Sequence, residues 1–384
     1  MYRRRRIAVV LSVALLAAVI AGLVSLVGGS GPGASGTTTT TGPGKTTGVR
    51  VTKTGVGMRT VVWTDTNTNA GAAVNPAPGG HAGPRKLVTE IWYPAIGGSK
   101  KTPTVRARAD YSGGPFPVIV FAQGFDTLPA TYEPLLTSWV NAGFVVVAPL
   151  FPDENANEID SLGDATTAQL ETAESDIVNE PYDIAYAVGE VEAGAAGTAS
   201  SGVTWLKGLV EPGKYALVGH SDGAQAVAAL VYSQQTGEAY ATTYAGLPER
   251  PFAVVILSGS ELAGTYAPPA SPSPLLFVQS AIDECNLPQN AAALLHDAGG
   301  GWFLKLLEAG HFSPYVGQGR AAPIVENLTV AFLNAALTGA PTLSELSPAI
   351  KTANVATLYS PSTPPVLTAL SPTSAEQLAA CSAR

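Results

Sequence analysis

Residues 214–231 read KYALVGHSDGAQAVAALV. The first five residues are typical of a short buried strand, and residues 224–231 are small and apolar, as in a buried helix. Between them stands Gly-His-Ser-Asp-Gly, a G-x-S-x-G motif in which a tight turn lifts the serine above the edge of a sheet. This context predicts that Ser221 is a nucleophile. The alternative is a glycine-rich turn whose serine merely caps the helix.

A serine hydroxyl needs a base to take its proton, and the chain contains four histidines. His81 lies in a Gly/Pro-rich loop, and His220, inside the motif, should point away from the serine into packing. His296 falls in a helical segment. His311 follows the apolar run at 302–307 and a Glu-Ala-Gly break, so it is expected in a loop after a late strand. We therefore predict that His311 is the base.

The acid that orients this base should lie between nucleophile and base in the chain. Residues 274–279 read PLLFVQ, a buried strand, and Asp283 follows its carboxyl end. We predict that Asp283 is the acid. Its neighbour Glu284 is the nearest rival, and Glu261, after the strand predicted at 253–257, is a weaker one. Capping of the next helix is the alternative role for Asp283.

Two backbone N–H groups should hold the negative charge that develops on the substrate carbonyl oxygen. Asp222, directly after the nucleophile, is expected to supply one. The strand predicted at 116–121 leads into a loop where Gly124 allows close backbone approach, and the Phe125 N–H is expected to be the second donor. The alternative is an ordinary glycine at the end of a strand.

These residues make the chain resemble the α/β-hydrolase superfamily. More narrowly, it resembles bacterial esterases related to plasma-type platelet-activating-factor acetylhydrolases, with cutinases and chlorophyllases as more distant relatives. The resemblance covers about residues 50–340, and it includes RKLVTEIWYPA at 85–95, the strand and loop at 116–125, and WVNAGFVVVAP at 139–149. Asn-Glu-Pro-Tyr-Asp-Ile at 179–184 resembles the start of the helix before the nucleophile strand, with Glu180 where an arginine is expected.

The resemblance implies an α/β-hydrolase fold, with a mostly parallel central sheet and helices on both faces. Apolar strands alternating with helical patterns favour the same architecture. It also implies that a Ser-His-Asp triad cleaves a small or lipid-like carboxylic ester through an acyl-enzyme, without a cofactor. Asp222 replaces the bulkier apolar residue common in cutinases, so their substrate class does not carry over. The alternatives are an amidase or acyltransferase with the same triad, and a non-catalytic surface module that keeps the fold.

The chain opens MYRRRR and then runs from Ile7 to Val27 without a charge. At about 1.5 Å per residue this stretch reaches roughly the 30 Å thickness of a bilayer core. Residues 1–27 are therefore predicted to anchor the protein in a membrane, with the rest outside the cytoplasm. A cleaved signal and a secreted protein form the alternative. Residues 28–49 read as a flexible Gly/Ser/Thr linker, 50–340 as the catalytic domain and 341–384 as a tail.

The chain has two cysteines, Cys285 and Cys381. In an exported protein they can form a disulfide that ties the tail to the loop of the predicted acid, and two unpaired thiols are the alternative. The sequence has no His or Cys cluster at metal-ligand spacing, so no metal site is predicted.

The formal net charge is −8, and no Lys or Arg occurs between Ala109 and Leu206. Acidic residues crowd residues 153–180. The sequence favours a solvated acidic insertion there. The alternative is a cap beside the active site that repels anionic substrates. The charge makes nucleic acid an improbable partner.

Overall fold

The computed structural model describes residues 55–66, 84–199, 202–234, 247, 249–262, 265–352 and 354–367. The predicted anchor and linker, His81 and Cys381 lie outside these residues. Within the described part, no helix has both the length and the apolar character to cross a bilayer.

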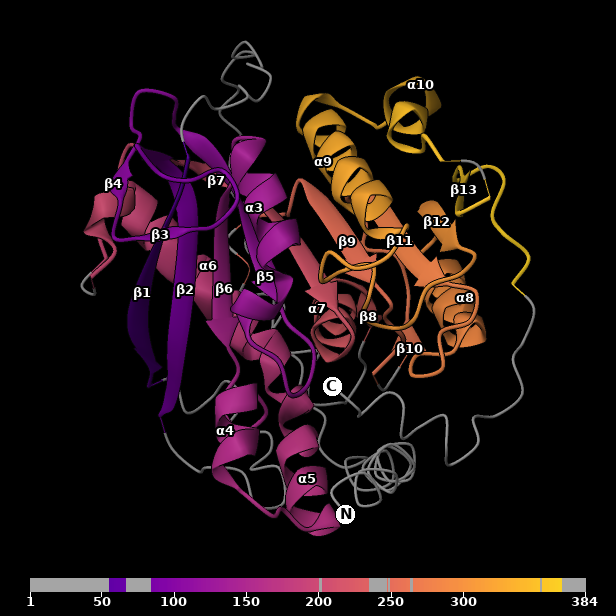
Figure 1. Cartoon of the computed structure of the whole chain (residues 1–384), viewed down its shortest axis with the longest axis horizontal. Helices are drawn as coiled ribbons and strands as arrows, with labels where there is room; N and C mark the ends of the chain where they lie inside the picture. The colour runs from indigo at the N-terminus through magenta and orange to yellow at the C-terminus, as the bar shows by residue number, and fades with distance from the viewer. Residues whose placement is uncertain are drawn as a thin grey trace, which may run out of the picture.

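A mixed, mostly parallel sheet forms the centre of the molecule (Figure 1). Its strands in chain order are β1 Gly55–Asp65, β2 Arg85–Ile96, β3 Thr104–Val105, β4 Arg108–Ala109, β5 Phe116–Ala122, β6 Val145–Leu150, β7 Val210–His220, β9 Ala253–Leu257, β11 Leu275–Ser280, β12 Trp302–Leu306 and β13 Ala356–Tyr359. Their spatial order is β13-β12-β11-β9-β7-β5-β6-β2-β1-β3, with β4 beside β2. The strands from β6 to β12 in this order run parallel, whereas β2 and β13 run antiparallel to their neighbours in that block. Two short strands, β8 Ser233–Gln234 and β10 Thr265–Tyr266, pair separately.

Helices cover both faces of the sheet. They are α3 Glu133–Asn141, α4 Ala156–Ser161, α5 Thr167–Glu174, α6 Glu180–Ala196, α7 Asp222–Tyr232, α8 Pro288–Asp297, α9 Ala322–Thr338 and α10 Leu343–Leu346, with 3-10 turns at Pro129–Tyr132, Ser175–Val178, Thr204–Leu206 and Ser347–Ala349. Side chains of α3 and α9 share one core cluster with one face of the sheet, and those of α6, α7 and α8 share the other. Figure 1 shows α3 and α9 on the near side and α6 on the far side. The predicted α/β-hydrolase fold is confirmed.

The central strands are apolar on both faces because helices cover both faces. All residues of β5, β6, β9 and β11 are buried. Strands of this kind read in the sequence as continuous apolar runs, which is why their predicted positions agree with the structure to within a residue or two. Because parallel strands end at the same edge of a sheet, the loops after β5, β7, β11 and β12 come together there.

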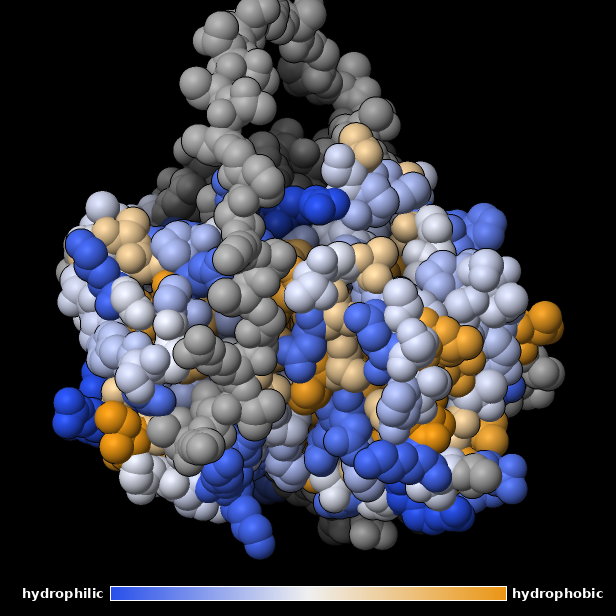
Figure 2. All heavy atoms as spheres, turned by 90° about the horizontal axis from the view of Figure 1, so that it is seen from above, coloured by the Kyte–Doolittle hydropathy of each residue, from blue (hydrophilic) through white to orange (hydrophobic). Residues whose placement is uncertain are grey.

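Hydrophilic and hydrophobic side chains are mixed on the face of the molecule that Figure 2 shows. Among the residues that the structure describes, the large exposed apolar side chains come from separate segments, and they are Val62, Ile96, Val105, Tyr111, Ile282, Leu343 and Val366. Single exposed apolar residues of this kind are ordinary in folded proteins.

The chain beyond residue 340 adds to the sheet, although its composition predicts a tail. The helix predicted at 323–337 is α9, but it is followed by α10 and by β13, which pairs antiparallel with β12. β13 is a four-residue edge strand that is only partly buried. Its short length and partial burial leave it without the continuous apolar run that identifies the central strands.

The acidic stretch is only partly the solvated insertion that the sequence favours, because Glu158, Asp160 and Asp164 are exposed but other acidic residues are not. Its elements α4 and α5 extend beyond the lower edge of the sheet in Figure 1. Yet the side chains of Glu154, Asp176 and Glu180 are at most 1% exposed. They are buried because the segment packs against the rest of the domain, and because one of these carboxylates pairs with a cation from a distant part of the chain.

That cation is Arg85, at the start of β2. Its guanidinium donates to both carboxylate oxygens of Asp176 at 2.9 and 2.7 Å, and to both of Asp183 at 2.9 and 2.7 Å. All three side chains are buried. Burial raises the pKa of Asp176 to about 6, although the charge of Arg85 opposes this rise. The ion pairs therefore fix the acidic segment and α6 to the sheet.

We predict that Arg85→Met lowers the free energy of unfolding by about 3–5 kcal/mol, because it leaves buried carboxylates without their cation. Urea unfolding at pH 7.5 measures the change. Arg320→Met, at an exposed guanidinium, is the control and should change the value by less than about 0.5 kcal/mol. Equal effects of the two substitutions would show that the buried ion pairs do not stabilise the fold.

Candidate active site

Ser221 lies at the tip of a tight turn between β7 and α7. Its backbone has φ 54° and ψ −119°, a conformation that costs a non-glycine residue about 1–3 kcal/mol. The flanking glycines allow the turn to pack. A Cβ on Gly219 would lie 2.2 Å from the Gly223 carbonyl oxygen, and one on Gly223 would lie 2.3 Å from the Gln123 carbonyl oxygen. The motif therefore forms the strained turn between a strand and a helix that its sequence predicts.

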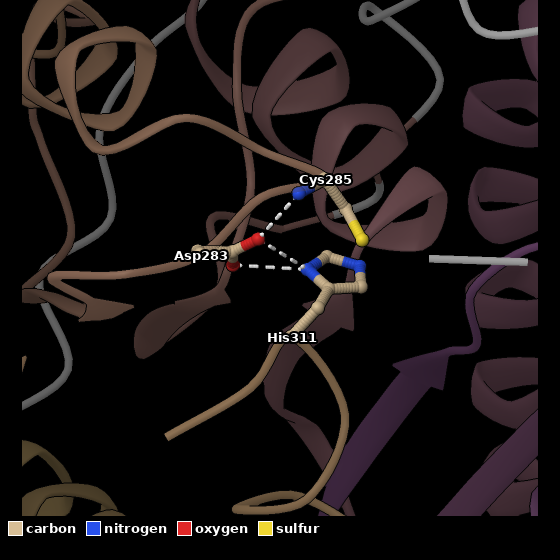
Figure 3. Close-up of side chains that lie close together, drawn as sticks. All are labelled: Asp283, Cys285 and His311. Carbon is tan, nitrogen blue, oxygen red and sulfur yellow. Dashed lines mark hydrogen bonds and ion pairs between the residues drawn. The ribbon is translucent and has the colours of Figure 1, made fainter. Parts of the chain in front are cut away.

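The structure brings Ser221, His311 and Asp283 into one hydrogen-bonded relay. The Nε2 atom of His311 lies 2.9 Å from Ser221 Oγ. Its Nδ1 atom lies 3.0 and 2.9 Å from the two carboxylate oxygens of Asp283 (Figure 3). Asp283 comes from the loop after β11 and His311 from the loop after β12. Three loops at one edge of the sheet thus place a hydroxyl, an imidazole and a carboxylate in the order that proton transfer requires.

Asp283 is held as an ionised carboxylate. It is completely buried, and burial alone raises its pKa, but the His311 imidazole and surrounding donors outweigh burial and leave the pKa below its ordinary value. The donors include the backbone N–H groups of Cys285 at 2.9 Å and Asn286 at 3.0 Å, and the side-chain amide of Gln279 at 3.1 Å. A carboxylate fixed in this way can orient the imidazole and stabilise its protonated form.

The rival acid Glu261 interacts with Asp297. Burial, together with a hydrogen bond and the negative charge of Asp297, raises the pKa of Glu261 to about 7. Asp297 in turn pairs with His296, whose side chain is 87% exposed. Both carboxylate oxygens on His311 Nδ1 belong to Asp283 and not to its neighbour Glu284. The local geometry therefore favours Asp283 as the acid.

The predicted oxyanion loop packs directly on the nucleophile. A Cβ on Gly124 would lie 2.9 Å from the Cβ of Ser221, so only glycine allows this approach. The Gly124 N–H donates to Tyr132 Oη at 3.2 Å. The next N–H along the loop is that of Phe125, the predicted donor to the substrate oxygen. Asp222, the other predicted donor, is the first residue of α7. The roles of Phe125 and Asp222 as oxyanion donors stay predictions.

The acidic segment supports this loop from outside. The Phe125 side chain packs against a small apolar cluster of α4 and α5, made of Ile159, Leu170 and Ala173. The Asp126 N–H donates to the Glu154 carbonyl at 2.9 Å, and the Ala156 N–H donates to the Thr127 carbonyl at 3.2 Å. Residues 153–180 therefore support the loop at 125–127 by packing and by backbone hydrogen bonds, a role that the charge of the segment does not indicate.

Glu154 and Glu180 form a buried pair of carboxyl groups close to Asp222. Both side chains are completely buried, and their four oxygens have no other hydrogen-bond partner in the described part of the chain. Burial raises the pKa of each well above its ordinary value, and the charge of Asp222 raises both further. Each carboxyl group therefore holds its proton more strongly than an ordinary glutamic acid does, and a protonated member of the pair can donate to the other. Glu180, which stands where the family resemblance implies an arginine, therefore pairs with the carboxyl group of Glu154.

Two residues that the sequence patterns do not single out hold the acid loop, and one of them, Ser280, also joins it to the base loop. The Ser280 hydroxyl donates to the Ala309 carbonyl at 2.6 Å and accepts from the Ile282 N–H at 3.2 Å. Beside it, Gln279 donates to Asp283 and, at 2.8 Å, to the Asn286 carbonyl. The signal that could have identified them is a pair of polar residues at the end of an otherwise apolar buried strand.

Asp283, Cys285 and His311 are the only described group of three or more His, Cys, Asp and Glu residues with donor atoms near enough to share a metal ion. Figure 3 shows the Cys285 side chain beside the imidazole. Because Asp283 hydrogen-bonds to His311, and His311 to Ser221, this group belongs to the relay. Cys381 lies outside the described residues, so the disulfide stays a prediction.

No family model matches the chain, and no curated protein matches it. Among solved structures, 494 chains match. One is a ferulic acid esterase from Streptomyces cinnamoneus, with a TM-score of 0.51 and 17% identity over 76% of this chain and 93% of that chain. At this identity the likeness shows the fold, which is the one found in α/β-hydrolase-type esterases. It does not test the narrower resemblance to esterases related to platelet-activating-factor acetylhydrolases.

The Glu154–Glu180 pair predicts a pH dependence of stability. A carboxyl group whose folded pKa is raised above its ordinary value of 4.5 contributes stability that is complete below that value and is lost as the pH rises through the raised pKa. Glu180→Gln removes one of the two titrating groups and keeps an amide donor for Glu154. The unfolding free energy of this variant should therefore decline less steeply than that of wild type between about pH 5 and 9.

Urea unfolding across that pH range measures the slopes. Glu158→Gln, at an exposed carboxylate in the same segment, is the matched control and should follow the wild-type slope. If Glu180→Gln also follows it, the carboxyl pair does not share a proton in the folded state.

Proposed function

We propose that this protein is a serine hydrolase that cleaves carboxylic esters. The observation that carries the proposal is the relay from Asp283 through His311 to Ser221, with distances of 2.9–3.0 Å, on a strained turn that presents the serine. The nearest acceptor for the serine proton is the Nε2 atom of His311. The ionised Asp283 keeps the other imidazole proton on Nδ1, which leaves Nε2 able to accept.

Acylation begins when Ser221 Oγ attacks the ester carbonyl and its proton passes to His311 Nε2. The tetrahedral intermediate carries its negative charge on the former carbonyl oxygen. The backbone N–H groups of Phe125 and Asp222 are proposed to donate to that oxygen. When the intermediate collapses, His311 gives its proton to the leaving alcohol, and Ser221 keeps the acyl group.

Deacylation repeats these steps with water. His311 takes a proton from a water molecule, which attacks the acyl-enzyme carbonyl. The same two N–H groups hold the second oxyanion. Collapse releases the carboxylic acid and returns the proton to Ser221.

Esters are the proposed substrates for two reasons. The fold is similar to that of an enzyme described as a ferulic acid esterase. The motifs also resemble those of bacterial esterases related to platelet-activating-factor acetylhydrolases. Asp222 directly follows Ser221, and its negative charge contributes to the raised pKa values of Glu154, Glu174 and Glu180. A neutral, small or lipid-like ester therefore fits the site better than an anionic one.

A location outside the cytoplasm is also proposed, with residues 1–27 as a membrane anchor. Support comes from the four arginines followed by an uncharged apolar stretch of bilayer length. The Cys285–Cys381 disulfide is proposed for the same compartment.

We predict that Ser221→Ala lowers kcat/KM for p-nitrophenyl butyrate by at least about 10³-fold, because no other group in the relay can form the acyl-enzyme. Ser138→Ala, which removes a hydroxyl that donates to the Leu135 carbonyl in α3, is the control and should retain wild-type activity. Equal rates in wild type and Ser221→Ala would end the proposal. The remaining hypothesis would then be a non-catalytic module that has the same fold.

The acid assignment gives a second prediction. Asp283→Asn should lower kcat by about 10³–10⁴-fold, because an amide in place of the carboxylate cannot hold the imidazole in the tautomer that accepts the serine proton. Glu261→Gln removes the rival carboxylate and should leave kcat within a factor of about three. If the two substitutions exchange these effects, Glu261 is the acid and the serine mechanism survives.

A further inference from the structure

His220, the residue before the nucleophile, joins three parts of the site. It is the last residue of β7, and its side chain is completely buried. Its Nδ1 atom lies 2.8 Å from Tyr132 Oη, and its Nε2 atom lies 3.1 Å from the backbone carbonyl oxygen of His311. The sequence predicts that this ring points into packing, but both of its nitrogens are also used in hydrogen bonds.

Chemistry fixes the direction of each of these bonds. A carbonyl oxygen only accepts, so His220 Nε2 carries a proton and donates to His311. In the neutral imidazole Nδ1 then accepts, and Tyr132 Oη–H donates to it. The phenol oxygen in turn accepts from the Gly124 N–H at 3.2 Å. One chain of donors thus runs from Gly124 through Tyr132 and His220 to the backbone of His311.

Aromatic rings surround this chain and keep water from competing with it. The His220 ring centroid lies 4.8 Å from that of Phe312 and 4.6 Å from that of Tyr315. The Thr127 hydroxyl lies farther from Tyr132 Oη, at 3.4 Å, and its own proton goes to the Gly124 carbonyl. The short bond of Tyr132 is therefore the one to His220.

We propose that His220 is a positioning residue for ester hydrolysis, which sets the oxyanion loop and the catalytic base relative to Ser221. This inference rests on the proposed function. The Nε2–H of His220 fixes the backbone of His311, whose side chain must lie within hydrogen-bonding reach of Ser221 Oγ. Through Tyr132, its Nδ1 fixes Gly124, which precedes the proposed donor Phe125. Both catalytic distances therefore depend on one buried ring that touches no substrate.

Removing this ring should lower the reaction rate, because the rate depends strongly on the positions of the reacting groups. A displacement of about 1 Å at a reacting group can lower a rate by about 10²-fold. Such a displacement affects the transition state more than the bound ester. The expected loss is therefore in kcat, whereas KM should change little.

Three variants separate the two hydrogen bonds from simple packing. His220→Leu removes both bonds, Tyr132→Phe removes the phenol that links His220 to Gly124, and His220→Gln keeps an amide N–H that can reach the His311 carbonyl. Tyr232→Phe is the control, because it deletes a buried hydroxyl without a hydrogen-bond partner in the described part of the chain. Kinetics with p-nitrophenyl butyrate are normalised to active sites titrated with diethyl p-nitrophenyl phosphate, so that misfolded protein is not counted.

We expect kcat per titrated site to fall by about 10–100-fold in His220→Leu and Tyr132→Phe, with KM within a factor of about three. His220→Gln should recover at least about tenfold over His220→Leu, and the control should match wild type. Unchanged kcat per site in both His220→Leu and Tyr132→Phe would overturn the positioning role, as would a His220→Gln variant no better than His220→Leu.

Nitrogen-15 NMR of the wild-type imidazoles tests the same inference without any turnover and without a variant that must fold. A neutral His220 ring with its proton on Nε2 supports the donor chain. A doubly protonated ring, or one protonated only on Nδ1, contradicts it. Absence of both esterase activity and titratable serine in wild type would instead count against the proposed function.

Discussion

The close packing of three backbone segments around Ser221 is the constraint on which the site depends. Gly219, Gly223 and Gly124 have no side chains, so β7, α7 and the loop after β5 meet at distances that any Cβ would prevent. The positive φ of Ser221 is the strain that this packing maintains. The hydroxyl therefore stands clear of the sheet at the edge where the loops of the acid and the base also end.

The buried carboxyl groups in and around the site differ in the groups that face them, and this decides their charge. Asp283 is buried but remains ionised, because the imidazole and three further donors face it. Asp176 and Asp183 share Arg85. The carboxyl oxygens of Glu154 and Glu180 face no hydrogen-bond donor from the rest of the described chain, and burial raises the pKa of both groups well above its ordinary value. The segment between β6 and α6 thus combines a large formal negative charge with a buried structural role.

The sequence was most informative where local pattern and topology agree. The strand, the turn and the helix around Ser221 are adjacent in the chain, and the predicted acid and base follow apolar strands whose ends meet at one edge of a parallel sheet. It was least informative for contacts between distant segments. Arg85 pairs with Asp176 across 91 residues, and His220 bonds to the His311 backbone across another 91. Such pairs depend on how elements pack, and neither periodicity nor composition records that packing.

The central claim is that Ser221 carries the acyl group during turnover. The most direct test is to mix the protein with p-nitrophenyl butyrate, quench with acid within the first turnovers, and locate any acyl group by peptide mass spectrometry. The account predicts one butyryl group on Ser221, at higher occupancy in a variant that deacylates slowly. Ester turnover without any acylated serine, or with the butyryl group on another residue, would contradict it.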